Sequence, residues 1–201
     1  MDANTSLFLT VNGFARSTPW LHGPLVVYAG YGLVLFAGLL IVGWWIARRD
    51  GEPAKVAAAV WAPLGTLLAV AVNQPIAAWV NESRPYAALP GILVLATPTT
   101  DPAFPSDHAV MAGAVTAGLF LVNRRLGWVA AALAVLMVFS RVYIAAHYPL
   151  DVAVGLLLGA AVTLAGWAVL RRVLVRVVDE VRASRLRPLV VASPNKSGPV
   201  T

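Results

Sequence analysis

Five long apolar stretches dominate the sequence, and they restrict the chain to folds that a lipid bilayer can accommodate. A helix needs about 20 apolar residues to cross about 30 Å of hydrocarbon, and most of these stretches approach or exceed that length. The stretches cover residues 24–47, 56–80, 106–122, 126–140 and 152–170, and we expect the fourth to continue to about residue 146. The sequence therefore predicts an all-α polytopic membrane bundle of five to six transmembrane helices.

The overall composition agrees with a membrane protein. Apolar residues make up 59% of the 201 residues and charged residues only 12%, against about a quarter charged in ordinary soluble domains. Such a composition excludes disorder over most of the chain. Proline and amide side chains interrupt the second stretch at Pro63 and at Asn73-Gln74-Pro75. We expect neighbouring helices to satisfy the backbone there and Asn73, Gln74 and Asn81 to form hydrogen bonds between helices, although Asn81 is close enough to the outer end to join a site instead.

The segments outside these stretches have less defined roles. Residues 4–14 have the pattern of an amphipathic helix at the membrane surface. Residues 86–98 are apolar but too short to span, which favours a re-entrant or interfacial segment. We assign residues 1–175 to a membrane-embedded domain and residues 176–201 to a basic cytoplasmic tail that is partly disordered near its end.

The basic residues indicate the orientation in the membrane. Alternation of the spans places twelve of the fifteen lysines and arginines on one side and Arg16, Arg84 and Arg141 on the other. Cytoplasmic loops carry the excess of Lys and Arg, so the first side and the C-terminus are predicted to be cytoplasmic in a multi-pass plasma-membrane protein. In a soluble protein the net charge of +6 would suggest nucleic acid. Here it follows the membrane topology, and we expect no nucleic-acid partner.

The side of the membrane opposite the predicted cytoplasmic side contains nearly all the polar residues that could take part in catalysis. The chain has no cysteine and three histidines, so a thiolate metal site or a cysteine nucleophile is excluded and histidine chemistry depends on very few positions. No Walker loop, zinc signature or G-x-S-x-G motif is present, and no metal or cofactor is expected.

The stretch FPSDHAV begins the third span. Ser106 suits a helix N-cap, and Asp107 suits the first turn beside the positive end of the helix dipole. Capping alone would explain both residues. The alternative is that the free N–H groups of this helix end bind an anion such as phosphate, while His108 donates a proton to a leaving oxygen.

The stretch SRVYIAAHYPLD joins the fourth and fifth spans. Pro149 fits the first turn of the fifth helix, which places His147 just before it and Asp151 just inside it. A carboxylate in that position can hold one imidazole nitrogen and leave the other free to attack. The simpler alternative is that Asp151 complements the helix dipole and His147 is an interfacial histidine.

Arg84 and Arg141 are the remaining candidates on this face. An arginine near mid-bilayer costs about 2.5 to 3.5 kcal/mol on insertion scales. The two side chains either extend to lipid headgroups or converge with the histidines as a phosphate clamp.

Together these residues resemble three motifs of the type-2 phosphatidic acid phosphatase superfamily. The third motif is complete in Ser140-Arg141, His147 and Asp151. The second reads Pro105-Ser106-Asp107-His108, with Asp107 where the family has glycine. The first keeps Arg84-Pro85 but has Ala77 where the family has lysine.

The resemblance implies roles for the site residues and a class of substrate. His147 would be the nucleophile that forms a phosphohistidine, Asp151 would orient it, and His108 would act as acid and base. The phosphoryl oxygens would be held by four residues: Arg84, Arg141, Ser106 and Asp107. The family works without a metal.

The resemblance therefore implies a membrane enzyme whose partners are the bilayer and a lipid phosphate substrate. The Pro-Ser-Asp-His sequence is similar to that of undecaprenyl-diphosphate phosphatases of the bacitracin-resistance type. This favours a polyprenyl diphosphate at the outer leaflet. The alternatives are another lipid phosphate, such as phosphatidylglycerophosphate, phosphatidate or a prenyl-phospho-sugar, and a member that has lost turnover. The sequence leaves the oligomeric state open.

The orientation gives a first prediction. Because the native chain lacks cysteine, single cysteines can be labelled without background. Asp101→Cys should react with an impermeant reagent from outside the cell, and Arg124→Cys should react only after the cytoplasmic face is opened. Labelling of position 101 from the cytoplasmic side alone would contradict the assigned orientation.

Overall fold

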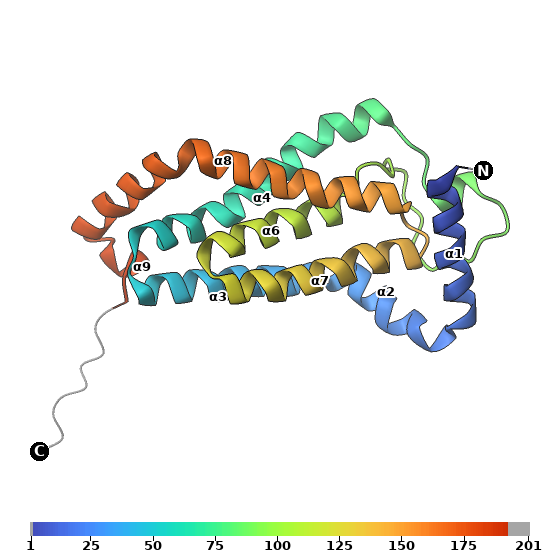
Figure 1. Ribbon diagram of the computed structural model, residues 1–201, viewed down its shortest axis with the longest axis horizontal. Coiled ribbons are helices and arrows are strands. Elements are labelled where there is room, and N and C mark those ends of the chain that lie inside the picture. The colour runs from blue at the N-terminus through green and yellow to red at the C-terminus, as the bar shows by residue number, and fades with distance from the viewer. Residues whose placement is uncertain (1, 193–201) are drawn as a thin grey trace, which may run out of the picture.

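The computed structural model describes residues 2–192 and is all-helical over that range, as expected. The helices assemble into an elongated bundle (Figure 1). In chain order the elements are α1 (Ala3–Ser17), the short 3-10 helix η1 (Pro19–Leu21), α2 (His22–Tyr31), α3 (Leu33–Asp50), α4 (Pro53–Val80), α5 (Pro85–Ala88), α6 (Asp107–Val122), α7 (Arg124–Tyr143), α8 (Pro149–Ala183) and α9 (Arg187–Val190).

Local sequence explains where several helices begin. The carboxylate of Asp2 accepts a hydrogen bond from the Thr5 N–H at 2.8 Å and caps α1. The side chain of Asn123 accepts from two N–H groups of the first turn of α7. Proline occupies the first turn of both α4 and α8, where its missing N–H leaves no bond unmade. The expected N-terminal helix is therefore present and extends slightly beyond residues 4–14.

Fewer helices than predicted meet the length of a membrane span. Within residues 2–192, three segments are long and apolar enough to span a membrane. They are residues 53–88, which comprise α4 and α5, and the helices α7 and α8. A fourth span results if α2 and α3 are taken as one segment, but these two helices are bent by 52°. The span predicted over residues 24–47 is therefore divided between two helices. The bend falls at Gly32, where an added Cβ would lie 2.5 Å from the carbonyl oxygen of Tyr28.

The stretch expected as the third span, residues 106–122, is α6, which has 16 residues. At 1.5 Å per residue it is about 24 Å long, shorter than the hydrocarbon layer. It lies in the middle of the bundle, packed against α3, α4, α7 and α8 (Figure 1). Most of its residues are buried. Neighbouring helices rather than lipid surround α6, so its length need not match the membrane.

Glycines allow α6 and α8 to pack closely. A Cβ on Gly113 of α6 would lie 2.1 Å from the Leu156 carbonyl oxygen, and one on Gly159 of α8 would lie 2.0 Å from the Val110 carbonyl oxygen. Small residues at helix interfaces permit such backbone approach in membranes, where apolar side chains gain little by leaving lipid. The α6–α8 contact therefore depends on the absence of side chains at these two positions.

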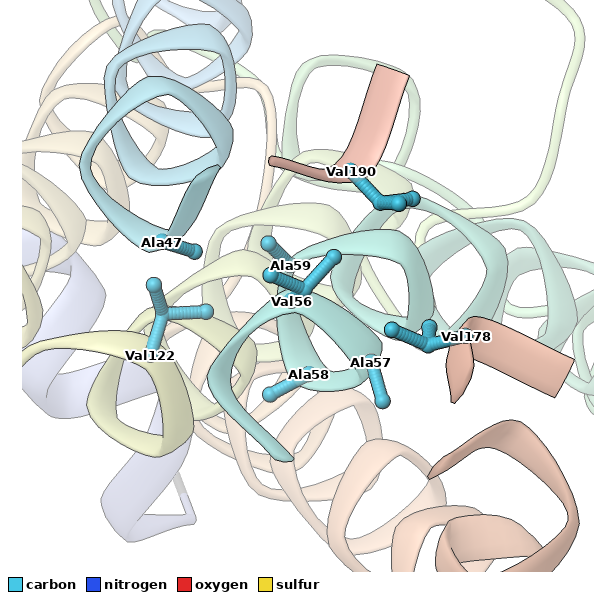
Figure 2. Close-up of a cluster of buried hydrophobic side chains, with 8 residues drawn as sticks. All are labelled: Ala47, Val56, Ala57, Ala58, Ala59, Val122, Val178 and Val190. Atoms are coloured by element: carbon cyan, nitrogen blue, oxygen red, sulfur yellow. The ribbon is translucent and has the colours of Figure 1, made fainter. Parts of the chain in front are cut away.

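The two ends of the bundle differ in composition. At one end Ala47 of α3, Val56 of α4, Val122 of α6, Val178 of α8 and Val190 of α9 share an apolar cluster (Figure 2). The predicted cytoplasmic basic residues adjoin these helix termini. At the other end α1, the irregular segment 89–106 and the start of α8 come together (Figure 1).

The C-terminal part of the chain is helical up to residue 190 apart from a short turn. The boundary proposed at residue 175 falls inside α8, which continues to Ala183, and α9 folds back so that the Ala192 N–H donates to the Arg48 carbonyl at 3.0 Å. The disorder predicted for the end of the tail concerns residues 193–201, which lie outside the described residues.

The close α6–α8 contact gives a second prediction. Gly159→Ala places a methyl group against the main chain of α6 and should destabilise the protein by about 1–3 kcal/mol, the usual cost of overpacking. Gly38→Ala is the matched control, because a Cβ there meets nothing within 4 Å and alanine favours a helix over glycine by about 1 kcal/mol. Thermal unfolding in detergent measures both. Equal stability of the two variants would contradict the close contact.

Candidate active site

A tight turn between α7 and α8 carries the most deeply placed histidine. Residues 144–148 leave the helix, and Ala145 adopts a left-handed conformation with φ of 65°. The N–H groups of Ala146 and His147 both donate to the Arg141 carbonyl, at 3.1 and 3.3 Å. A non-glycine residue in this conformation is strained, and such strain persists where the surrounding structure requires it. Here the turn directs the His147 side chain into the protein, where it is 2% exposed.

The hydrogen bonds of His147 define its tautomer. Its Nδ1 lies 2.8 Å from the Ala103 carbonyl oxygen, which can only accept, so Nδ1 carries the proton. Its Nε2 lies 3.2 Å from Nη1 of Arg84 and 3.3 Å from Nη2 of Arg141. Guanidinium groups only donate, so Nε2 is the unprotonated nitrogen. The ring therefore presents a lone pair to two positive charges.

The surroundings keep this imidazole neutral. Burial lowers the pKa of His147 well below its ordinary value of 6.5, and the charges of Arg141 and Arg84 lower it further. A neutral imidazole is the form that can act as a nucleophile. The surroundings therefore favour the neutral form of His147.

Asp151 lies behind His147 but does not bond to it directly. Its Oδ2 is 3.6 Å from Nδ1 of His147 and accepts the Tyr148 N–H at 2.8 Å. The direct acceptor of the imidazole proton is the Ala103 carbonyl. Asp151 stabilises the first turn of α8 through its side chain, and its own carbonyl accepts from the Ser106 N–H at 3.1 Å. It thus joins the starts of α6 and α8.

Arg84 connects three parts of the chain. Its Nη1 donates to the Ala146 carbonyl at 3.1 Å, and its Nε donates to the Asp101 carbonyl at 3.0 Å. Its Nη2 forms a salt bridge with Oδ2 of Asp101 at 2.8 Å. The side chain of Arg84 is 9% exposed, against 66% for Asp101. These bonds fix the guanidinium beside His147.

Arg141 approaches His147 from the last turn of α7. Besides its contact with His147, its Nη1 donates to the Ala29 carbonyl of α2 at 3.4 Å. Its buried Nε has no hydrogen-bond partner among residues 2–192. Arg141 therefore retains donor capacity that a bound anion could use.

The start of α6 forms another side of the site. Ser106 is the N-cap residue and Asp107 lies in the first turn, as expected. The Ser106 hydroxyl makes no capping bond, and within the described chain its Oγ is buried without a partner. The carboxylate of Asp107 accepts from Nδ2 of Asn73 at 2.7 Å and from Nε2 of Gln74 at 3.1 Å. The prediction that amides bond between helices is confirmed for Asn73 and Gln74, whereas Asn81 is the C-cap of α4 and its side chain makes no such bond within residues 2–192.

A cavity of about 700 Å³ connects these groups. Five of the predicted site residues line it: Arg84, Asp107, His108, Arg141 and His147. Ser106 and Asp151 are buried behind them. Ala77 and Gln74 of α4 form part of the wall, so the position of the absent family lysine faces this cavity. No group of three or more His, Cys, Asp or Glu side chains within residues 2–192 is placed to hold a metal ion.

Sequence reasoning missed two of the groups that hold the site together. The Ala103 carbonyl leaves no trace in the sequence, because every residue has a carbonyl. Asp101 did leave a weak signal, since it is the only acidic residue between Glu82 and Asp107. Its role depends on the fold of the segment between α5 and α6, which no periodic pattern predicts.

Residues of all three motifs thus line one cavity of a helical bundle. Comparison with known protein families agrees with the resemblance that the motifs indicate. The family model described as the PAP2 superfamily matches residues 58–174. The chain belongs to the PAP2 superfamily. The match runs from within α4 to within α8 and includes the motif residues from Arg84 to Asp151.

Individual PAP2 relatives are similar over most of the chain. The bacitracin transport permease protein BcrC of Bacillus licheniformis is 28% identical over 79% of this chain and 76% of its own length. The undecaprenyl-diphosphatase BcrC of Bacillus subtilis is 27% identical over 74% of this chain and 75% of its own. The crystal structure of Aquifex aeolicus LpxE superposes with a TM-score of 0.60 at 26% identity, covering 82% of this chain and 94% of that one. This protein is accordingly a multi-pass membrane member of the superfamily.

Proposed function

We propose that this PAP2 protein hydrolyses a lipid phosphate or diphosphate, with undecaprenyl or another polyprenyl diphosphate as its substrate, through a phosphohistidine intermediate. The observation that carries the proposal is the environment of His147. A neutral Nε2 faces the cavity between two guanidinium groups. A phosphoryl group that reached this nitrogen would meet both positive charges.

The chemistry follows from this placement. Nε2 of His147 attacks phosphorus, a P–N bond forms, and the bond to the leaving oxygen breaks while His108 donates a proton to that oxygen. A water molecule then attacks the phosphohistidine, gives its proton to His108, and releases phosphate and free His147. A covalent intermediate divides one slow hydrolysis into two easier steps.

Charge stabilisation comes from groups that are already in position. Arg84 is held by Asp101 and the Ala146 carbonyl before substrate binds, so little reorganisation is needed. Arg141 has an unused donor, the buried Ser106 Oγ behind the cavity wall has no partner within the described residues, and the N–H groups of the first turn of α6 have no helical acceptor. Because the Asp107 carboxylate is itself an anion, we assign its contribution to phosphate binding to its main-chain N–H. Phosphoryl transfer depends mainly on such positioning and electrostatics.

The substrate and location rest on relatives and topology. The Bacillus subtilis relative is named an undecaprenyl-diphosphatase, and the second motif here has the Asp107 variant. We further propose that α6 crosses the membrane as the third of five spans and that the cavity lies at the outer leaflet. The helix ends that carry the basic residues lie at one end of the bundle, and the segment between α5 and α6 and the start of α8 lie at the other (Figure 1). Residues of the segment between α5 and α6 line the cavity, which supports this orientation.

A third prediction tests the nucleophile and the acid. His147→Ala should abolish phosphate release, and His108→Ala should lower kcat by roughly 10²–10⁴, the usual contribution of a positioned acid or base. His22→Ala is the matched control, because His22 bonds to the Ala15 carbonyl away from the cavity. Purified variants are compared by phosphate release in detergent. Wild-type rates in His147→Ala would contradict the mechanism.

Substrate choice is tested on the same purified protein. A panel of polyprenyl diphosphate, phosphatidylglycerophosphate, phosphatidate and a prenyl-phospho-sugar should show the highest kcat/KM for the diphosphate, with activity retained in a chelator. Preference for another lipid would replace the substrate and keep the chemistry. Absence of phosphate release from every member would favour a non-catalytic protein.

A fourth prediction concerns Ala77. A lysine at this cavity-lining position could reach the phosphate with its long stem. One charge-assisted hydrogen bond of about 1.5 kcal/mol corresponds to a gain of roughly tenfold in kcat/KM, so Ala77→Lys should preserve or raise activity on a soluble short-chain diphosphate. Ala77→Met supplies the bulk without the charge. A large loss in a well-folded Ala77→Lys protein would instead make the small residue part of substrate selection.

A further inference from the structure

Helix α1 contains a buried amide side chain, Asn12, that forms hydrogen bonds with the irregular segment between α5 and α6. Asn12 is 2% exposed. Its Nδ2 donates to the Leu93 carbonyl at 2.7 Å, and its Oδ1 accepts the Leu93 N–H at 3.0 Å. Leu93 lies in an irregular part of the chain, where main-chain groups have no helical partners. One side chain therefore satisfies both polar groups of this residue.

Other residues of α1 hold the same segment. The guanidinium of Arg16 donates to the Gly91 carbonyl. Val11 and Ala15 pack in one cluster with Leu93 and Leu95. The path of residues 91–96 is thus determined by α1, because the segment has no regular secondary structure of its own.

The opposite side of this segment reaches the active-site cavity. The N–H groups of Leu95 and Ala96 donate to the Ile144 carbonyl at 3.2 and 2.9 Å. Leu95, Ala96 and Thr97 line the cavity together with Ile144, which begins the turn that carries His147. A continuous set of contacts therefore runs from Asn12 to the cavity wall.

The reactive group is held by different contacts. His147 is fixed by the Ala103 carbonyl and by the two arginines, and none of these belongs to residues 91–97. A change at Asn12 should therefore displace the wall and leave the nucleophile in place. This separation distinguishes substrate binding from the chemical step.

We propose that Asn12 is a positioning residue for substrate binding: it fixes residues 93–97 as the wall of the lipid-phosphate cavity and makes α1 part of the substrate site. The proposal rests on the proposed phosphatase function. Removing the amide leaves the N–H and carbonyl of the partly buried Leu93 without their side-chain partner, which costs part or all of two hydrogen bonds. The wall should then become mobile, and KM should rise more than kcat falls.

The test compares two asparagines of the same helix. Asn12→Leu removes both bonds to Leu93, and Asn12→Asp keeps the acceptor but loses the donor. Asn4→Leu is the control, because Asn4 Oδ1 accepts from the Leu150 N–H at 2.9 Å and does not touch the segment. Hydrogen–deuterium exchange of residues 89–97 and steady-state kinetics on a lipid diphosphate are measured for each variant and the wild type.

We expect faster exchange of residues 89–97 and a rise in KM of roughly 5- to 100-fold in Asn12→Leu, with kcat within about threefold of the wild type. Asn12→Asp should show a smaller change, and Asn4→Leu should show neither effect. Unchanged exchange, an unchanged KM, or a fall in kcat alone would overturn the proposal, and Asn12→Asp decides the matter if Asn12→Leu does not fold. Inactivity of the wild type would reject the proposed function, while the exchange data would still show whether Asn12 fixes the wall.

Discussion

A buried guanidinium places the strongest constraint on this end of the molecule. Arg84 is always charged, and an unpaired charge in so dry a position would be very costly. Its donors are matched by the carboxylate and carbonyl of Asp101, the Ala146 carbonyl and Nε2 of His147. These acceptors come from the segment before α6 and from the turn before α8. The charge of Arg84 is therefore compensated only when both irregular segments adopt their observed paths.

Main-chain carbonyl and N–H groups hold most of the other residues of the site in place. The Ala103 carbonyl fixes the tautomer of His147, and the Ala103 N–H in turn donates to the Glu82 carbonyl at 2.8 Å, two residues before Arg84. His147 and the segment that carries Arg84 are thus held by the same short piece of backbone. Close packing of α6 against α8 supports this arrangement, because Gly155 of α8 lies against the main chain of Ser106.

The sequence predicted the parts of this structure that depend on periodicity and residue type. Apolar stretches located the bundle helices, and proline and serine marked the starts of α8 and α6. The bend at Gly32 was not predictable, because glycine is common in membrane helices and only the contact with Tyr28 and Met137 shows what this one does. The sequence also did not predict the central position of α6, because an apolar stretch has the same residue pattern whether lipid or protein surrounds it.

The candidate site shows the same limit more sharply. Charged residues of unusual position, such as Arg84 and Arg141, could be identified because charge is rare in this chain. The Asn12–Leu93 pair could not, because it joins a surface helix to a segment 81 residues away and half of it is main chain. Motifs record the residues whose side chains react, whereas the groups that position them are mostly carbonyls and N–H groups placed by the fold.

The charges around the cavity suggest how such a site can bind an anion. Arg84 and Arg141 supply two positive charges, Asp101 and Asp107 supply two negative charges, and His147 is neutral. His108 adds a positive charge when it carries the proton that it donates. The cavity wall therefore has little net charge, so bulk attraction contributes little to phosphate binding. Directed hydrogen bonds must contribute most, because those from fixed donors strengthen as charge develops on the transferring group. Asp101 occupies Nη2 and Nε of Arg84 and leaves Nη1 directed at Nε2 of His147. The salt bridge thus aims the donor of Arg84 at the atom where phosphorus would be bound.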